Sequence, residues 1–354
     1  MKQLLTKSRR QVAFVLVILL ALSSLAGCSS KKENSSDASN GPLTKTSFLL
    51  NTVVTITLYD STDESILDET LDLCKKYENI FSRTSSTSEL YKLNEGLLEK
   101  DKDGYIVSDE LYNLIKTGVK YGDLSKGKFD IAIEPVSSLW DFTAEDPVVP
   151  KASDIKKNLP LVNYKDIVVS KKNRISFKKE GMGIDLGAIA KGYIADQLKA
   201  FLLKNNVKSA MINLGGNVLC VGKKVDGSAF NIGIQKPFAD RNETIAIMQL
   251  EDVSVVSSGI YERYFTVNGK SYHHILNPAT GYSYDNNLVG LTIVSKTSVD
   301  GDGLSTSCFA LGLKDGMALI DSLDDTYAVF ITKDNKVHYS SNFKKHIKIT
   351  EVSN

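Results

Sequence analysis

The 354-residue chain lacks an excess of charge of either sign, because 43 Lys and Arg residues stand against 42 Asp and Glu residues. A general nucleic-acid binder normally carries a basic surplus, so this balance argues against that class. Proline is scarce at seven residues and glycine is moderate at 24, which excludes collagen-like and low-complexity chains. The single Trp argues against a carbohydrate cleft lined with tryptophans. An apolar share of 42% is sufficient for a folded core.

Cysteine is also scarce. The four residues are Cys28, Cys74, Cys220 and Cys308, and no two of them are close in sequence. Neither a disulfide framework nor a Cys/His zinc site is indicated by this spacing. Cys308 lies in an apolar helical stretch, so we expect it to be a small core residue.

The N-terminus has the composition of an export signal. A basic head precedes an apolar run from Val12 to Leu22, which is shorter than the ~20 residues that a membrane-spanning helix needs. The run ends at Leu25-Ala26-Gly27-Cys28, which resembles the bacterial lipobox, where the Cys is acylated. An uncleaved signal anchor is the alternative. We therefore predict a signal peptide over 1–27, lipidation of Cys28 and a Ser/Lys/Asn-rich flexible tether over 28–45. One folded domain over 46–350 would follow, held at the extracytoplasmic face of the cell membrane.

Strands outnumber helices in the rest of the chain and are often joined by short turns. Helical spacing predicts helices over 63–81, 110–121, 186–205, 302–311 and 314–322. Alternating or β-branched runs predict strands over 48–59, 167–169, 174–177, 210–213, 218–221, 229–234, 244–250, 254–257, 264–267, 288–294, 328–331 and 336–339. Helices and strands do not alternate strictly, so we predict an α+β fold with mixed, largely antiparallel sheets and packed helices, and not a Rossmann fold.

Two glycine-containing segments are candidates for close approach to a ligand. Gly183 to Tyr193 places Gly and Ala around a predicted helix start, where free amides and Lys191 would suit a phosphate. The alternative is a plain helix start capped by Asp185. The segment matches neither a dinucleotide fingerprint nor a P-loop. Asn213-Leu214-Gly215-Gly216-Asn217 is either a ligand-facing loop or, at least as readily, a hairpin turn.

Two other segments carry chemically active side chains. His273 and His274 precede the turn signal Asn277-Pro278, and neighbouring residues of a strand point to opposite faces, so at most one of the two would face a site. A lone His is more often structural than catalytic. Asp302 and Thr306 are spaced i, i+4 and would share a helix face, where a carboxylate and a hydroxyl suit a hard cation such as Mg²⁺. Asp302 as a simple N-cap is the alternative.

Seven stretches together resemble the ApbE-like family of FAD:protein FMN transferases, in the family's order and over about residues 46–345. They are FSR with SEL and LN from Phe81; GKFD from Gly127 with Pro135 and Leu139-Trp140; IDLGAIAKGY from Ile184; NLGGN; SSGIYERYF from Ser257; YHHILNPATGY from Tyr272; and DGLST from Asp302. The resemblance implies an ApbE-like, T-fold-like architecture with two lobes around a flavin site.

The resemblance also implies a reaction and a set of site residues. FMN would pass from FAD to a Thr or Ser hydroxyl of an exported or membrane-tethered acceptor protein through a phosphoester bond, and AMP would leave; such acceptors serve electron transfer. By similarity, Mg²⁺ would be held by Asp302, Thr306 and the carbonyl of Ala188, with Ser305 beside them. His274 is the candidate base, and the choice between His274 and Asp302 stays open. FAD itself would contact Leu50, Thr84, Lys128, Phe129, Asp130, Asp185, Lys191 and Leu276.

Two other functions fit the same residues. An FAD pyrophosphatase would use water in place of the acceptor hydroxyl and release FMN and AMP. A non-enzymatic lipoprotein would only bind flavin or another ligand. Loss of Mg²⁺-dependent turnover in an Asp302→Ala variant would separate an enzyme from a binder.

Overall fold

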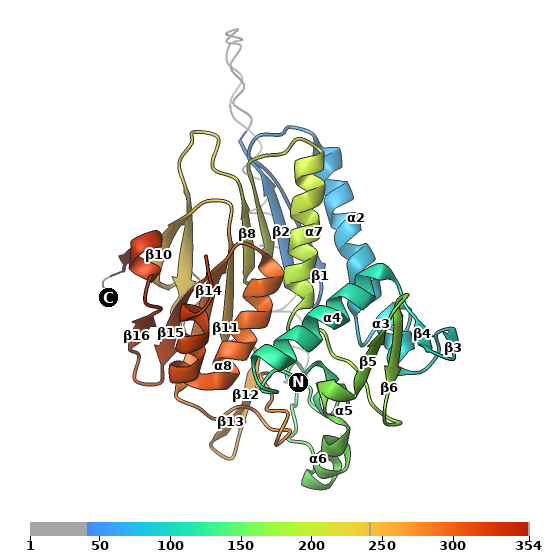
Figure 1. Cartoon of the computed structure of the whole chain (residues 1–354). Coiled ribbons are helices and arrows are strands. Elements are labelled where there is room, and N and C mark those ends of the chain that lie inside the picture. The colour runs from blue at the N-terminus through green and yellow to red at the C-terminus, as the bar shows by residue number, and fades with distance from the viewer. Residues whose placement is uncertain (1–40, 241, 353–354) are drawn as a thin grey trace, which may run out of the picture. The chain divides into compact units, whose positions relative to one another are not determined.

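An eight-stranded antiparallel sheet forms the centre of the computed structural model, which describes residues 41–240 and 242–352 (Figure 1). Its strands, in order across the sheet, are β1 (Leu43–Leu49), β2 (Thr52–Leu58), β7 (Ala210–Leu214), β8 (Asn217–Val221), β11 (Ser254–Gly259), β14 (Leu288–Ser295), β15 (Tyr327–Thr332) and β16 (Val337–Tyr339). The predicted signal peptide, Cys28 and the predicted tether up to residue 40 lie outside the described residues.

Three smaller sheets accompany the central one. They comprise a three-stranded sheet of β17 (Lys348–Glu351), β10 (Thr244–Leu250) and β9 (Phe230–Gln235); a four-stranded sheet of β3 (Lys100–Asp101), β4 (Gly104–Ile106), β6 (Arg174–Phe177) and β5 (Ile167–Ser170); and a hairpin of β12 (Tyr264–Val267) and β13 (Lys270–His273). All pairings are antiparallel. The predicted α+β class with antiparallel sheets is confirmed.

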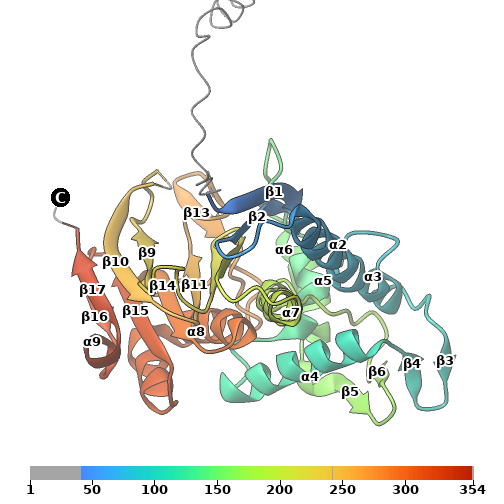
Figure 2. The same cartoon turned by 90° about the horizontal axis from the view of Figure 1, so that it is seen from above.

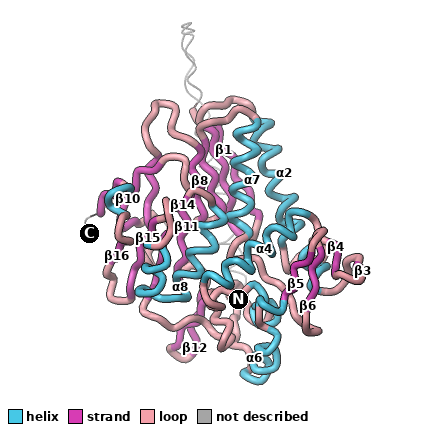
Figure 3. Tube along the Cα trace, in the orientation of Figure 1, coloured by secondary structure: helices cyan, strands magenta, loops and turns pink. Residues whose placement is uncertain are grey.

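The longer helices lie on one face of the central sheet, as the cyan and magenta layers of Figure 3 show. The helices are α2 (Glu64–Phe81), α3 (Glu89–Asn94), α4 (Asp109–Leu124), α5 (Glu134–Ser137), α6 (Ala152–Asn158), α7 (Ala190–Lys204), α8 (Ser298–Asp321) and α9 (Phe343–His346). Seen end-on in Figure 2, α7 lies among α2, α4 and α8. It packs on α8 and α2, and α8 packs on β14 and β11.

The opposite face of the central sheet is covered by the three-stranded sheet. Phe230 and Met248 from that sheet join Val255 and Val329 of the central one in a shared core. Consequently all eight residues of β14 are buried. A strand that is buried on both faces reads as a continuous apolar run, which explains why 288–294 lacks polar alternation.

Four predicted boundaries need correction. The strand expected over 48–59 is a hairpin that turns at Leu50 and Asn51, both with φ near +55°, and β1 begins at Leu43, inside the range predicted as tether. The helix expected from residue 186 begins only at Ala190. The helices expected over 302–311 and 314–322 are one element, kinked where Gly312 adopts φ 82°.

The single tryptophan joins two distant parts of the chain. Trp140 is buried, stacks on Phe142, and packs with Phe265 of β12 in a small aromatic core. Its indole Nε1 donates a hydrogen bond to the carbonyl of Gly281 at 3.0 Å. This bond fixes the turn that follows Asn277-Pro278, which is a turn as its sequence predicts.

The three described cysteines are buried and unpaired, as their spacing predicts. Burial raises the pKa of Cys74, Cys220 and Cys308 to about 12, so these thiols are inert. Among the helices of residues 41–352 whose placement is described, none has the length and hydropathy required to cross a bilayer.

Candidate functional site

The site is built where the starts of α7 and α8 meet. A Cβ on Gly192 would lie 2.2 Å from the carbonyl oxygen of Ser298, so only glycine allows the two helices to approach this closely. Asp196, one turn further along α7, accepts hydrogen bonds from the amides of Ser298 at 2.7 Å and Val299 at 2.9 Å. These bonds cap the N-terminus of α8, while burial of the Asp196 carboxyl raises its pKa to about 6.

Asp302 is a buried carboxylate at the centre of this crossing. Its Oδ2 accepts a hydrogen bond from the amide of Gly192 at 2.6 Å, and its Oδ1 accepts one from Asn217 Nδ2 at 2.9 Å. Burial raises the pKa of the carboxyl, and the charge of Lys191 together with these two bonds opposes that rise. Because α8 begins at Ser298, Asp302 lies inside the helix and is not its N-cap; that alternative is wrong.

The backbone carbonyl of Ala188 does not accept the hydrogen bond from the amide of Gly192 that a regular helix would provide. In an α-helix the amide of residue 192 would donate to the carbonyl of residue 188. Here the amide of Gly192 donates to Asp302 instead, while the neighbouring amides of Ala190 and Tyr193 donate to the carbonyls of Leu186 and Ile189. The Ala188 carbonyl is therefore left as a potential ligand at the same helix start.

Two hydroxyl residues complete the predicted cation set. Thr306 is half-buried and lies one turn after Asp302 on α8. Ser305 is buried; its Oγ donates to the carbonyl of Asp302 at 2.9 Å and accepts from Ser258 Oγ at 2.9 Å. Because Ser305 already has two protein contacts, it is the weakest ligand candidate of the set.

The donor set fits a hard divalent cation. Carboxylate, hydroxyl and backbone carbonyl oxygens suit Mg²⁺, which is commonly held by one or two carboxylates plus the phosphates of a substrate. Within the described part of the chain, no three His, Cys, Asp or Glu side chains gather as a metal cluster. Asp302 would thus act as the one carboxylate of a site that a diphosphate completes.

The structure separates the two adjacent histidines. His273 is buried; its Nε2 donates to the carbonyl of Tyr284 at 2.9 Å and its Nδ1 accepts from the amide of Ile275 at 3.3 Å. Both of its nitrogens are occupied, so its role is structural. His274 is exposed to solvent, and its Nδ1 lies 3.3 Å from the carbonyl of Arg263. Since a carbonyl only accepts, Nδ1 carries the proton and Nε2 keeps a lone pair.

The surroundings of His274 favour a neutral imidazole. Desolvation by the surrounding chain is the largest cause that lowers its pKa, followed by the charges of His273, Arg263 and Lys191. The charge of Lys191 lowers the pKa of both His274 and Asp302.

Arg263 joins the His274 segment to the first hairpin. Its carbonyl accepts the amide of His274 at 3.2 Å, and its Nη2 donates to the carbonyl of Asn51 at 3.1 Å. Leu50, half-buried at the same hairpin tip, donates its amide to Glu78 Oε1 at 2.8 Å. The predicted flavin contact at Leu50 is thereby brought to the segment that carries the candidate base.

Asp185 is held by a different set of partners from the one expected of a helix cap. Its Oδ2 lies 2.9 Å from Arg83 Nε and accepts from Ser137 Oγ at 2.7 Å, while its Oδ1 accepts from the amide of Gly187 at 2.9 Å. Since α7 begins at Ala190, the cap interpretation is wrong. Asp185 and Arg83 form a partly buried ion pair beside the glycine-containing segment.

The GKFD stretch, Gly127 to Asp130, is the next segment with predicted flavin contacts. Lys128 is exposed, and its carbonyl accepts from Tyr284 Oη at 2.8 Å. Phe129 is buried in the main core. Asp130 accepts from the amide of Tyr164 at 3.0 Å, and burial raises its pKa to about 6. Because the side chain of Phe129 is buried, the predicted contact of this residue with flavin would have to be made by its backbone.

Thr84 and Leu276 complete the predicted flavin contacts. Thr84 is exposed in the loop after α2. Leu276 is half-buried, and its backbone pairs with that of Ser283 in an isolated bridge. Contacts of these two residues with FAD stay predictions.

The NLGGN stretch is a hairpin turn, as one of its two interpretations predicts. Gly215 and Gly216 adopt φ 65° and 96° between β7 and β8. Only glycine is tolerated at Gly215, where a Cβ would meet Thr52 Oγ1 at 2.0 Å. The turn places Asn217 at the start of β8, facing Asp302.

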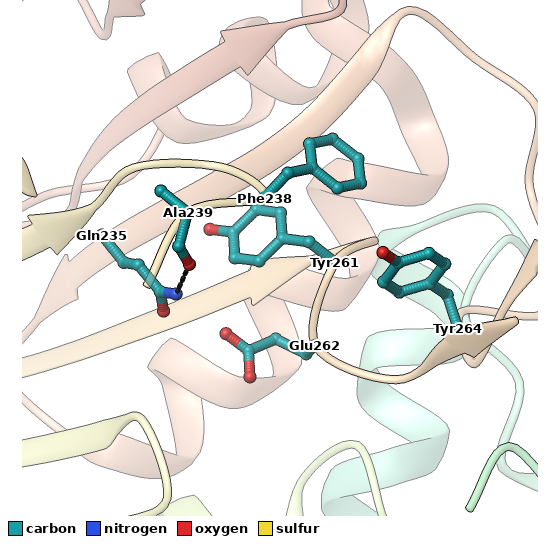
Figure 4. A pocket seen from close by; sticks show the side chains of 6 residues that line it. All are labelled: Gln235, Phe238, Ala239, Tyr261, Glu262 and Tyr264. Atoms are coloured by element: carbon teal, nitrogen blue, oxygen red, sulfur yellow. Dashed lines mark hydrogen bonds between the residues drawn. The ribbon is translucent and has the colours of Figure 1, made fainter. Parts of the chain in front are cut away.

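A shallow pocket borders the His274 segment. Figure 4 shows Tyr261, Glu262 and Tyr264, which flank Arg263, opposite Phe238 from the β9–β10 connection. Phe238 is 58% exposed and adopts φ 60°, and its ring packs against those of Tyr261 and Tyr264. Aromatic side chains on both sides of Arg263 in sequence therefore line this pocket.

Sequence reasoning missed four residues that shape the site: Asn217, Asp196, Gly192 and Arg263. Asp196 was detectable as a carboxylate one turn after Gly192, which is the last glycine of IDLGAIAKGY. Asn217 and Arg263 act on residues that are 85 and 212 positions away in sequence. No local pattern could have indicated those two pairings.

Comparisons with known proteins show which sequences and folds this chain is similar to. The sequence model of the ApbE family matches residues 50–331. An FAD:protein FMN transferase of Klebsiella pneumoniae (strain 342) is 35% identical over 294 residues, covering 83% of this chain and 90% of that protein. One of Treponema pallidum (strain Nichols) is 29% identical, covering 81% and 82%. The crystal structure of the ApbE protein of Thermotoga maritima superposes with a TM-score of 0.77 at 30% identity, covering 86% of this chain and 98% of that one.

Proposed function

The chain belongs to the ApbE family, and on that premise we propose that it is an FAD:protein FMN transferase acting on an exported acceptor. The observation that carries the proposal is the convergence of Asp302, the freed carbonyl of Ala188 and Lys191 at one glycine-lined helix start. Such a start suits an anionic diphosphate together with a divalent cation. The names of the relatives support flavin transfer as the reaction.

The chemistry follows from the residues at the two ends of the site. The oxygen of an acceptor Thr or Ser forms a bond to the FMN phosphorus, the phosphorus–oxygen bond to AMP breaks, and AMP leaves with that electron pair. The hydroxyl proton passes to Nε2 of His274, the nitrogen that the Arg263 carbonyl leaves unprotonated. Asp302, Thr306 and Ala188 would hold Mg²⁺, which when bound neutralises charge on the diphosphate and on departing AMP.

The lipid anchor belongs to the same proposal. Acylation of Cys28 would hold the enzyme at the extracytoplasmic face of the membrane. An acceptor tethered to that membrane would meet it at a raised effective concentration. Labelling with a radioactive or alkyne-bearing fatty acid, compared between the full chain and its Cys28→Ser variant, tests the anchor separately from the reaction.

The transfer itself is tested with purified enzyme, Mg²⁺ and membrane and secreted fractions of the host. We expect a flavin-fluorescent band that survives a denaturing gel, and an acceptor peptide that carries FMN on Thr or Ser in mass spectrometry. FMN in place of FAD is the matched control, because it contains no diphosphate to break. Absence of covalent flavin on every exported protein would refute the proposal.

FAD pyrophosphatase activity is the second candidate, because solvent reaches His274 and water could take the place of the acceptor hydroxyl. Its signature is AMP and FMN released at the same rate with and without an acceptor. A transferase should release AMP in step with acceptor modification. A protein that only binds flavin would release no AMP at all.

A further inference from the structure

A chain of buried polar side chains connects Asp302 to the central sheet. Asn217 Nδ2 donates to Asp302 Oδ1 at 2.9 Å, Ser298 Oγ donates to Asn217 Oδ1 at 2.7 Å, and Ser254 Oγ donates to Ser298 Oγ at 2.9 Å. All four residues are at most 5% exposed. The bonds join β8, β11 and two positions on α8, so the chain ties the carboxylate to the central sheet.

The direction of these bonds fixes the amide of Asn217. Because the carboxylate of Asp302 only accepts, the NH₂ group of Asn217 faces it, and the oxygen of Asn217 then accepts the proton of Ser298 Oγ. A buried carboxylate without donors is strongly disfavoured. Asn217 supplies one donor to Asp302 and the amide of Gly192 supplies the other.

We propose that Asn217 is a positioning residue that orients the Asp302 carboxylate for a divalent cation. This inference rests on the proposed function. Each Asp302 oxygen accepts one protein hydrogen bond, and a carboxylate oxygen offers about two acceptor positions, so each retains one for a cation. Donors that orient a ligand in this way typically change metal affinity by about 10- to 100-fold when removed.

The test is Asn217→Leu, which keeps the approximate volume and removes the donor without adding charge. Mn²⁺ is titrated into wild type and variant in the presence of FAD, and free Mn²⁺ is read by electron paramagnetic resonance. We expect about 10- to 100-fold weaker Mn²⁺ binding. The Mg²⁺ concentration for half-maximal AMP release should rise by a similar factor, and high Mg²⁺ should restore part of kcat.

Asn286→Leu is the matched control. Asn286 is a half-buried Asn whose Nδ2 donates to the carbonyl of Phe309 on α8 at 2.7 Å and whose Oδ1 accepts from the amide of Leu288 at 2.9 Å. Its loss should lower Tm without changing Mn²⁺ affinity. If Asn217→Leu fails to fold, Ser298→Ala replaces it; the orientation of Asn217 is then released, and Mn²⁺ binding should weaken by a smaller factor.

Three results are decisive. Wild-type Mn²⁺ affinity in a folded Asn217→Leu, or in Ser298→Ala, overturns the inference. Absence of Mn²⁺ binding by the wild type overturns both the inference and the proposed cation. Weaker Mn²⁺ binding in the variants, alongside a wild type that transfers no flavin, would uphold the role of Asn217 while refuting the proposed transfer reaction.

Discussion

The two ends of the candidate site are built in opposite ways. At the carboxylate end, comprising Asp302, Gly192 and Asn217, the functional group is buried and both of its oxygens are hydrogen-bonded. At the imidazole end, comprising His274 and Arg263, the functional group is exposed and a single carbonyl orients it. A group-transfer enzyme needs this contrast, because its donor must be held rigidly while a second macromolecule must reach the reacting atom.

The largest effect should come from removing the charge at the carboxylate end. Asp302→Asn keeps the size of the side chain but eliminates the anion, and we expect a fall in kcat of roughly 100- to 1,000-fold, the size of losing one preorganised electrostatic contact. AMP release and in-gel flavin fluorescence measure it. Near-normal transfer by this variant would show that the contrast between the two ends has no bearing on catalysis.

The imidazole end should be less sensitive. His274→Gln keeps a polar side chain and removes the base, and we expect kcat to fall by about 100-fold with little change in Mg²⁺ dependence. His273→Gln is the control, because the bonds of His273 to Tyr284 and Ile275 are structural; it should lower Tm more than kcat. The opposite pattern would assign the base to His273.

A substitution that disturbs the crossing of α7 and α8 beside Asp302 should lower the free energy of unfolding. Gly192→Ala would press a methyl group against the carbonyl of Ser298 at 2.2 Å, and overpacking of this kind costs about 1–3 kcal/mol in free energy of unfolding. Denaturant titration measures that change. Gly187→Ala, on an exposed position whose nearest neighbour is the Asp185 carboxylate at 3.1 Å, should cost much less. Equal losses would mean that the crossing is not tightly packed.

The smallest expected effect is a difference between the two ends in how the stability of the fold depends on pH. It is measured as Tm between pH 4 and pH 7, with a chelator present to remove metal ions. The folded-state pKa of Asp196 is about 6 against an ordinary 3.8, so its contribution to stability is present in acid and is lost as pH rises through 6. The folded-state pKa of His274 is lowered, so its contribution is lost as pH falls below 6.5. Asp196→Asn should therefore reduce the loss of Tm as pH rises, and His274→Gln should reduce the loss of Tm as pH falls. Slopes unchanged by both substitutions would contradict these pKa shifts.

Residues close in sequence could be predicted and residues joined across the fold could not. The helix predicted over 63–81 is α2, because its apolar spacing and the Asp63 cap are local signals. The turn at Leu50 and Asn51 was missed because both adopt positive φ without glycine, and Leu50 has no local preference for that region.

The candidate site follows the same rule. Spacing placed Asp302 and Thr306 on one helix face, and strand alternation separated His273 from His274. The N-cap interpretation of Asp302 failed because α8 begins four residues earlier, at Ser298, under a cap from Asp196 on another helix. The donors to Asp302 come from Gly192 and Asn217, which no local pattern connects to it.

The position of the only tryptophan provides a built-in optical reporter. Trp140 is bonded to the carbonyl of Gly281, in the turn that continues from the His274 segment. Indole emission overlaps flavin absorption, so arrival of the isoalloxazine ring should quench that emission without any engineered label. Stopped-flow fluorescence could then time substrate entry and exit directly, turnover by turnover, in the unmodified enzyme.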